Sequence, residues 1–121
     1  MKIGDVYLIA NPKPDKKHYH FVVSDVVDSN MLVLVFMSTI KDGIDYDDAC
    51  VLSPGEMDFI VSDSYIVYEH VYFADNDDFE NRINIGAVKY KGHASDAIMR
   101  RIKQGASESR RIRPAFIKYF G

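Results

Sequence analysis

Residues 31–40 read MLVLVFMSTI, and the first seven of them form the longest apolar run in the chain. A strand with one face in water alternates apolar and polar residues, whereas a continuous apolar run is typical of a strand buried on both faces. This stretch is therefore predicted to be the central strand of a β-sheet. It is too short to span a bilayer as a helix, which takes about 20 apolar residues, so no membrane span is expected.

Segments rich in β-branched and aromatic residues flank this strand and are predicted to form further strands. They lie at residues 5–10, 19–24 with an extension to 27, 49–52, 64–73 and 83–90. Polar turn residues separate them at 11–14, 28–30, 41–48, 53–56 and 75–78. Because these connections are short and suggest no helix, we expect a small antiparallel barrel rather than a doubly wound βαβ sheet.

The end of the chain has a helical pattern. Ser95 is a suitable N-cap for a helix over 96–104, whose apolar stripe is Ile98, Met99 and Ile102. Gly105 is predicted to end this helix, and Ser107 or Ser109 to start a further turn of structure. Pro114 suits the first turn of a short last helix through Phe120.

A length of 121 residues predicts one domain, with a β-barrel over 1–90 and a basic helical tail over 91–121. The first part carries 7 Lys and Arg against 16 Asp and Glu, a charge of −9, and the tail carries 8 against 2, a charge of +6. Such a tail either lies against its own acidic barrel, the simpler interpretation, or contacts nucleic acid.

Several classes of function lack their sequence signals. Cys50 is the single cysteine, so no internal disulfide forms, and the N-terminus does not resemble a signal peptide. A cytoplasmic location is therefore expected. The chain also lacks a nucleotide-phosphate loop, a nucleophile elbow and paired cysteines, and no cofactor is expected.

Two histidines are candidates for metal or acid–base chemistry. His18 and His20 are two residues apart, which on a strand places both imidazoles on one face. No third ligand follows at a metal-binding spacing, so surface histidines are favoured over a metal site. Asp45, Asp47 and Asp48 lack the glycine and glutamate of a calcium loop and are interpreted as part of a solvated loop.

Ser38 and Thr39 are the candidate hydroxyl groups, because they end the most buried strand at the mouth of the expected barrel. Two interpretations are open. The hydroxyls either cap the strand end by bonding to backbone, or belong to a functional site.

The order of segments resembles the PemK/MazF-like toxins. The residues that carry the likeness are Gly4 to Tyr7, Phe21 to Asp25, Val33 to Thr39 and Ser64 to Val67. The resemblance covers roughly residues 3 to 75. It implies a small SH3-like antiparallel barrel with a helical C-terminal part, a homodimer, and an antitoxin protein as partner.

The resemblance also implies metal-independent cleavage of single-stranded RNA. Family members use a basic residue just before the second strand and a hydroxyl at the end of the third. The hydroxyl corresponds to Ser38 or Thr39, and Lys17-His18 stands where the family has Arg-Pro. The predicted catalytic set is Lys17, His18, His20, Ser38 and Thr39, in which lysine supplies charge and a histidine exchanges protons.

The alternative is a non-catalytic SH3-like interaction module that has lost the family's arginine. Such a module would bind a protein or peptide through aromatic surface residues, for which Tyr7, Tyr19 and Tyr68 are the candidates.

Overall fold

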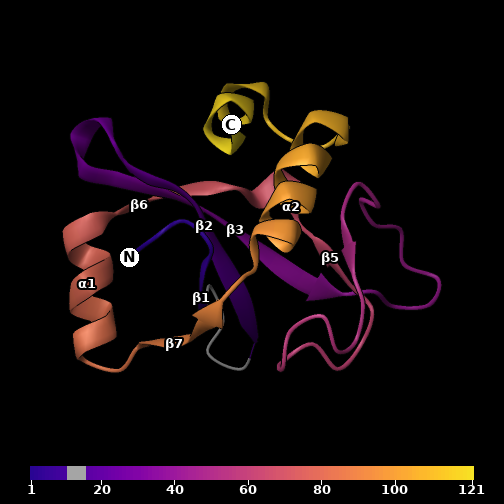
Figure 1. The fold of residues 1–121 in the computed structure, drawn as a ribbon, viewed down its shortest axis with the longest axis horizontal. Helices are drawn as coiled ribbons and strands as arrows, with labels where there is room; N and C mark the ends of the chain where they lie inside the picture. The colour runs from indigo at the N-terminus through magenta and orange to yellow at the C-terminus, as the bar shows by residue number, and fades with distance from the viewer. Residues whose placement is uncertain (11–15) are drawn as a thin grey trace.

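The computed structural model describes residues 1–10 and 16–121, so the loop predicted at 11–14 lies outside the described residues (Figure 1). Strands, two α-helices and short 3₁₀ helices (η) follow one another in these residues. Their order is β1 (Asp5–Ala10), β2 (Lys17–Val27), η1 (Asp28–Asn30), β3 (Met31–Thr39), β4 (Val51–Leu52), β5 (Ser64–Ile66), η2 (Tyr68–His70), β6 (Tyr72–Asp75), α1 (Asn76–Asn84), β7 (Val88–His93), α2 (Asp96–Glu108) and η3 (Pro114–Phe120).

The strands form one antiparallel sheet in the order β4-β5-β3-β2-β1-β7, and β6 pairs with the first half of β3. The predicted central strand is confirmed, since β3 contacts β2 on one side and both β5 and β6 on the other. Within the described residues β4 and β7 do not pair, so the sheet is not closed. The protein is thus mainly β, with one antiparallel sheet, a helix before its last strand and further helices after it.

The sheet buries a hydrophobic core on each face, as a central strand without alternation requires. Val33 and Val35 of β3 belong to the core that α2 and η3 cover, whereas Leu32 and Leu34 belong to the core beneath α1. All four side chains are fully buried. In Figure 1 the two α-helices accordingly lie over different parts of the sheet.

The strand predicted over 64–73 is divided in the structure. β5 pairs with the end of β3 through Met37↔Ile66, whereas β6 pairs with its beginning through Leu34↔Tyr72. The turn η2 lies between the two segments. A single straight strand does not make both pairings, because the 3₁₀ turn inserts residues that match no partner on β3.

The prediction of a loop at 75–78 and a strand at 83–90 was wrong in this region. Asp75 is the N-cap of α1, its carboxylate accepting a hydrogen bond of 2.9 Å from the backbone nitrogen of Asp78. The helix runs to Asn84, and β7 begins only at Val88. A helix therefore does lie between two strands. The cluster of acidic residues belongs to the first turn of this helix, where negative side chains are favourable, rather than to a loop.

The predicted helix α2 is confirmed, and Ser95 caps it by accepting a hydrogen bond of 3.2 Å from the nitrogen of Ile98. Its predicted end at Gly105 was wrong, because the helix continues to Glu108 and Ser109 is its C-cap. Gly105 is instead a point of close contact, since a Cβ atom there would lie 2.3 Å from the hydroxyl of Tyr68.

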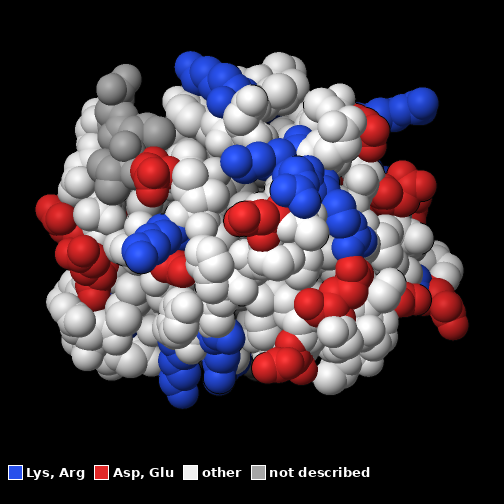
Figure 2. Space-filling view, viewed as in Figure 1, with Lys and Arg blue, Asp and Glu red and all other residues white. Residues whose placement is uncertain are grey.

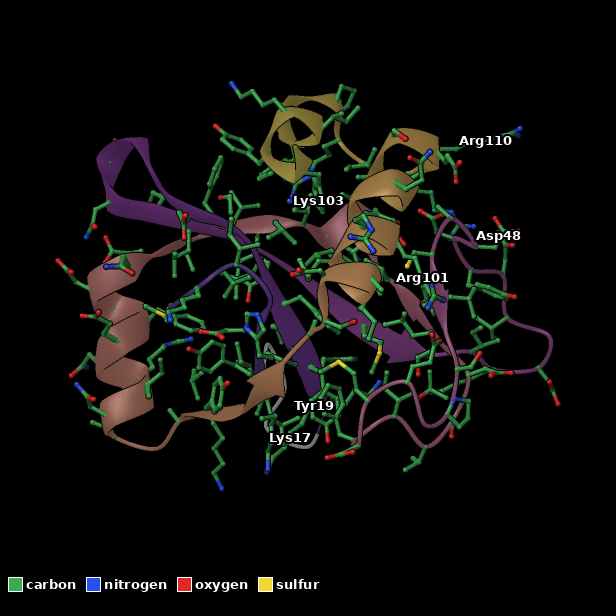
Figure 3. The ribbon with its side chains drawn as sticks, viewed as in Figure 1. Lys17, Tyr19, Asp48, Arg101, Lys103 and Arg110 are labelled. Atoms are coloured by element: carbon green, nitrogen blue, oxygen red, sulfur yellow. The ribbon has the colours of Figure 1, made fainter. Side chains whose placement is uncertain are left out.

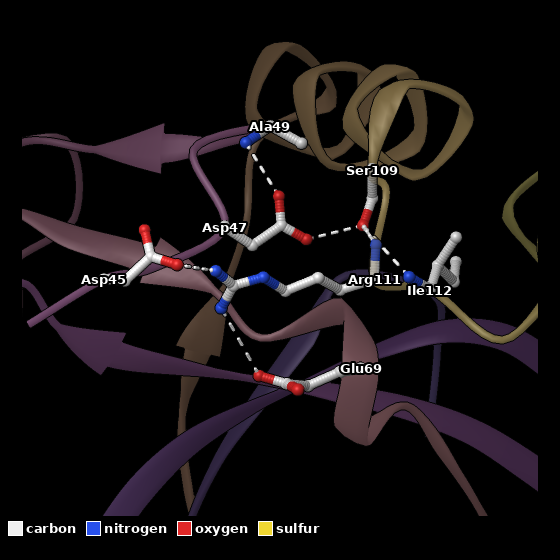
Figure 4. A network of polar contacts seen from close by, with 7 residues as sticks. All are labelled: Asp45, Asp47, Ala49, Glu69, Ser109, Arg111 and Ile112. Carbon is white, nitrogen blue, oxygen red and sulfur yellow. Dashed lines mark hydrogen bonds and ion pairs between the residues drawn. The ribbon is translucent and has the colours of Figure 1, made fainter.

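The segment after α2 is bound to the sheet side of the molecule through a network of polar contacts (Figure 4). Ser109 donates a hydrogen bond to Asp47, and Arg111 forms ion pairs with Asp45 and Glu69. Asp47 is buried and also accepts a hydrogen bond of 3.1 Å from the backbone of Ala49. The loop at 41–48 is thus only partly solvated, because the C-terminal segment forms an ion pair with Asp45 and a hydrogen bond with buried Asp47.

Candidate functional site

A hollow of about 540 Å³ lies where β2 begins and β3 ends. The pairing of these strands reaches as far as Tyr19↔Met37, and the residues that precede Tyr19 and follow Met37 line the hollow. The hollow lies at the ends of both strands, and its lining includes consecutive residues, which belong to opposite faces of the sheet. Four of the five predicted catalytic residues therefore line one site: Lys17, His18, Ser38 and Thr39.

The hollow is locally basic although the sheet region is acidic overall. Lys16 and Lys41 line it together with Lys17, and no carboxylate is among the described residues that line it. Low-dielectric walls around charges of one sign concentrate counter-ions, so this site favours an anionic ligand. Sequence reasoning missed both Lys16 and Lys41. Lys41 in particular was assigned to an aspartate-rich loop, and only the folded chain brings it beside Lys17.

His18 is suited to accept a proton. Its ring packs against Phe36 at 4.7 Å between centroids. Burial, reinforced by the charges of Lys16 and Lys41, lowers the pKa of His18 below its ordinary value of 6.5. The imidazole is therefore neutral at pH 7, which is the form a general base requires.

His20 lies apart from this hollow. It shares the His18 face, since both rings pack against Phe36, but its side chain is buried and its Nδ1 atom lies 2.7 Å from the Tyr72 hydroxyl. Burial, with a smaller contribution from the neighbouring His18, lowers the pKa of His20 to about 3. The structure thus separates the two histidines, one at the rim of the site and one beneath it.

The described residues hold no group of three or more histidine, cysteine, aspartate or glutamate side chains in reach of one metal ion. Within the part of the chain that the structure describes, His18 and His20 therefore lack the further ligand that a metal site would need.

The far wall of the hollow comes from the segment between β4 and β5, which the sequence did not indicate. Phe59 stacks on Tyr19 at 4.0 Å between ring centroids, and Ile60, Val61 and Ser62 continue the wall. The segment is anchored to α2, because Arg101 pairs with Glu56 and donates a hydrogen bond of 2.6 Å to the Val51 carbonyl. The side chain of Ile60 is buried in the hydrophobic core, which holds this segment in place.

Two of the aromatic residues predicted at the surface are buried. Tyr7 packs edge-on against Phe79, and the hydroxyl of fully buried Tyr68 donates a hydrogen bond of 2.6 Å to the Ile102 carbonyl. Both therefore belong to the cores. Tyr19 alone of the three is partly exposed, and it lines the basic hollow.

Neither a protein-family model nor a curated protein matches this chain. No described helix has the length and apolar character that crossing a membrane would require.

Proposed function

We propose that this chain is a metal-independent endoribonuclease of the PemK/MazF-like type that cleaves single-stranded RNA. The observation that carries the proposal is the meeting of Lys17, His18, Ser38 and Thr39 in one basic hollow lined by no carboxylate among its described residues. A phosphodiester is the anionic group that such a site would bind, and an adjacent base is what its cleavage needs.

In the proposed reaction His18 removes the proton of a ribose 2′-hydroxyl. The 2′ oxygen attacks the neighbouring phosphorus, and the bond from phosphorus to the 5′ oxygen breaks. Lys17 donates a proton to the departing 5′ oxygen, leaving a 2′,3′-cyclic phosphate and a 5′-hydroxyl. Exchange with water then returns both side chains to their starting protonation states.

The remaining residues would stabilise the charge that develops on the phosphorane. Lys16 and Lys41 line the same hollow and supply positive charge, and the hydroxyls of Ser38 and Thr39 supply hydrogen bonds to non-bridging oxygens. Such donors act most strongly in a partly enclosed site, where little water competes with them.

We further infer that the open sheet is a variant of the SH3-like barrel, with β7 and the short β4 at its two unpaired edges. The strand order supports this proposal, because β5, β3, β2 and β1 are neighbours in the sheet and helices follow the last strand. A toxin of this type would work in the cytoplasm as a homodimer, restrained by an antitoxin protein.

The test is direct cleavage by the purified protein. A mixed-sequence single-stranded RNA, incubated with the protein in excess EDTA, is expected to give fragments that end in a 2′,3′-cyclic phosphate. The His18→Ala protein, purified identically, controls for contaminating nucleases. Activity that disappears in EDTA and returns with a divalent ion would refute the metal-independent mechanism.

A second function, a protein-binding module, is favoured by one different observation. Phe73 of β6 is 41% exposed and packs with Phe116 and Tyr119, while Arg113 lies 4.5 Å from the Phe116 ring centroid. Exposed aromatic residues beside arginine are typical of protein interfaces. Growth arrest and shortened cellular RNA after induced expression would favour the nuclease, whereas the absence of both would favour the binding module.

A further inference from the structure

The basic residues of the C-terminal part fall into two groups in the structure. Arg101, Arg111 and Arg113 are engaged within the molecule. Arg101 pairs with Glu56, Arg111 pairs with Asp45 and Glu69, and Arg113 donates to the Val71 carbonyl. These contacts confirm that part of the tail lies against the acidic sheet region, and they leave the other cations to be explained.

Arg100 and Lys103 form the second group, on one face of α2. They are three residues apart, and within the described residues neither has an ion-pair partner. Both line two adjoining hollows of about 490 and about 240 Å³. Asp96 is the only aspartate or glutamate among the described residues that line either hollow. Figure 2 shows blue side chains gathered over α2 on the viewed face.

Apolar side chains of one core line both the smaller α2 hollow and the catalytic hollow. Ile3 and Met99 line the smaller α2 hollow, and Tyr19 and Phe59 line the catalytic one. Ile3, Tyr19 and Phe59 all pack against the same core, to which Met99 belongs. Figure 3 shows Tyr19 near Lys17 in the lower part of the view and Lys103 higher up on α2. In Figure 2 an acidic group lies just below the blue side chains over α2, and the surface below that group is largely uncharged.

We propose that Arg100 and Lys103 bind the phosphate backbone of the same single-stranded RNA whose scissile phosphate lies at Lys17, so that the strand crosses Tyr19 and Ile3 on its way to α2. The inference rests on the proposed function for the identity of the strand. Cations at both ends match phosphates, and an aromatic and apolar floor between them matches bases, because base–aromatic stacking tolerates any sequence.

Charge complementarity favours RNA over a protein as the occupant. The α2 face is unbalanced toward positive charge, because Arg100 and Lys103 line both hollows and Asp96 supplies the one acidic side chain among the described residues of their linings. An extended polyanion neutralises each of these cations in turn, and every contact releases a condensed counter-ion.

The experiment measures binding separately from cleavage. The probe is a fluorescent, mixed-sequence 2′-O-methyl oligoribonucleotide, which lacks the attacking hydroxyl and is not cleaved. Its Kd is measured by anisotropy over a range of salt concentrations for the wild type, R100Q/K103Q, and the matched control R82Q/R110Q. The control removes the same charge from α1 and from Arg110, which follows the C-cap of α2 and lines neither of the two hollows.

We expect R100Q/K103Q to bind about tenfold more weakly and to lower the magnitude of the salt slope by about 1.4, which corresponds to two lost phosphate contacts on a single strand. The control should keep the wild-type slope. Equal Kd values and slopes for the two double variants would overturn the inference. So would a wild type that fails to bind the probe.

Cleavage of RNA by the same proteins keeps the two proposals apart. A wild type that cleaves RNA while the α2 variant binds normally refutes only the α2 path. A wild type that binds the probe through α2 but cleaves nothing refutes only the catalytic proposal. A protein ligand whose binding is lost in R100Q/K103Q, with no RNA binding in the wild type, would show that the α2 face serves a different partner.

Discussion

The Nδ1 atom of His20 on β2 lies 2.7 Å from the hydroxyl of Tyr72 on β6, and β3 pairs with both of these strands. Burial raises the pKa of the Tyr72 hydroxyl far above its usual value, so the hydroxyl keeps its proton and is hydrogen-bonded to the imidazole in its neutral form. The Nε2 atom of His20 is buried and has no hydrogen-bond partner in the described residues. This imidazole is a neutral part of the core and has no access to a substrate.

This arrangement predicts acid sensitivity of folding. The unfolded chain binds a proton at His20 as the pH falls through 6.5, whereas burial delays protonation in the folded chain to about pH 3. Stability is therefore complete above the unfolded pKa and is lost as the pH falls from there toward the folded pKa. At about pH 5 the loss is roughly 2 kcal/mol, from about 1.4 kcal/mol per pH unit.

Urea denaturation of the wild type and His20→Gln at about pH 7 and about pH 5 measures this effect. The variant is expected to lose about 2 kcal/mol less than the wild type between these two values. His70→Gln, a substitution at an exposed histidine, is the matched control. An equal pH dependence for the wild type and His20→Gln would contradict the prediction, even if the variant is less stable overall.

The sequence predicted the elements that burial alone determines. The run 31–40 has to be buried on both faces wherever it lies, and β3 is indeed the centre of the sheet. The cap at Ser95 and the apolar stripe of α2 are local features, so their prediction needed no tertiary information. The helix α1 was missed because its buried side chains, Phe79 and the partly buried Ile83, are few and its acidic first turn resembles a loop.

The site was predicted in part for the same reason. Lys17, His18, Ser38 and Thr39 lie at strand ends that can be read locally, and their meeting follows from the register of β2 on β3. His20 was included in the predicted catalytic set because its spacing from His18 shows that both lie on one face of the strand. The spacing does not show how deeply each side chain is buried. Lys41 and Phe59 line the hollow from separate loops. Their positions could not be predicted, because no local sequence pattern indicates how a loop folds back over a sheet.

Gly105→Ala is expected to destabilise the protein by about 1 to 3 kcal/mol, through overpacking. At an exposed helix position the same change would stabilise by up to about 1 kcal/mol, so the sign is informative. The added Cβ would lie 2.3 Å from the Tyr68 hydroxyl and 3.0 Å from the Ala49 carbonyl oxygen. Urea denaturation of the variant at neutral pH measures the cost.

A double-mutant cycle identifies the source of that cost. Tyr68→Phe removes the oxygen nearest to the new methyl group, so Gly105→Ala should cost less in the Tyr68→Phe background than in the wild type. The relief is partial, because Ala49 and Cys50 also lie 3.0 Å from the added atom. Additive costs would indicate that the clash with Tyr68 is not the cause.

We expect a homodimer, because large apolar side chains remain exposed on the single chain. Phe73 and Ile117 are each 41% exposed near η3, a region a second copy would cover. Sedimentation equilibrium should give twice the chain mass of 13.8 kDa, and Phe73→Glu should shift the protein toward the monomer. A single 13.8 kDa species at high concentration would show that the exposed side chains serve another purpose.

Single substitutions in the basic hollow should separate catalysis from stability. Lys17→Ala, His18→Ala and Ser38→Ala are each expected to lower RNA cleavage at least about tenfold, since loss of a contact to the phosphorane removes more than about 1.4 kcal/mol of transition-state stabilisation. All three positions lie at the rim, where truncation changes the unfolding free energy by only about 0.5 kcal/mol. Single-turnover cleavage and urea denaturation of the same samples measure the rate and the unfolding free energy together. If all three variants cleave RNA at the wild-type rate, the basic hollow is not the catalytic site.

The pH profile of cleavage tests the role of His18 independently of the size of the rate. Burial and the charges of Lys16 and Lys41 lower the pKa of His18 below 6.5, so the neutral base persists, and cleavage continues, below the pH at which an ordinary histidine becomes protonated.

Lys41→Gln removes one of these charges, and the pKa of His18 then rises toward 6.5. The acidic limb of the pH–rate profile should therefore move to higher pH in Lys41→Gln, whatever that change does to the maximal rate. Lys89→Gln, an exposed lysine on β7 that is not among the residues lining the hollow, is the matched control and should keep the wild-type limb. An acidic limb that stays in place in Lys41→Gln would mean that a group other than His18 accepts the proton.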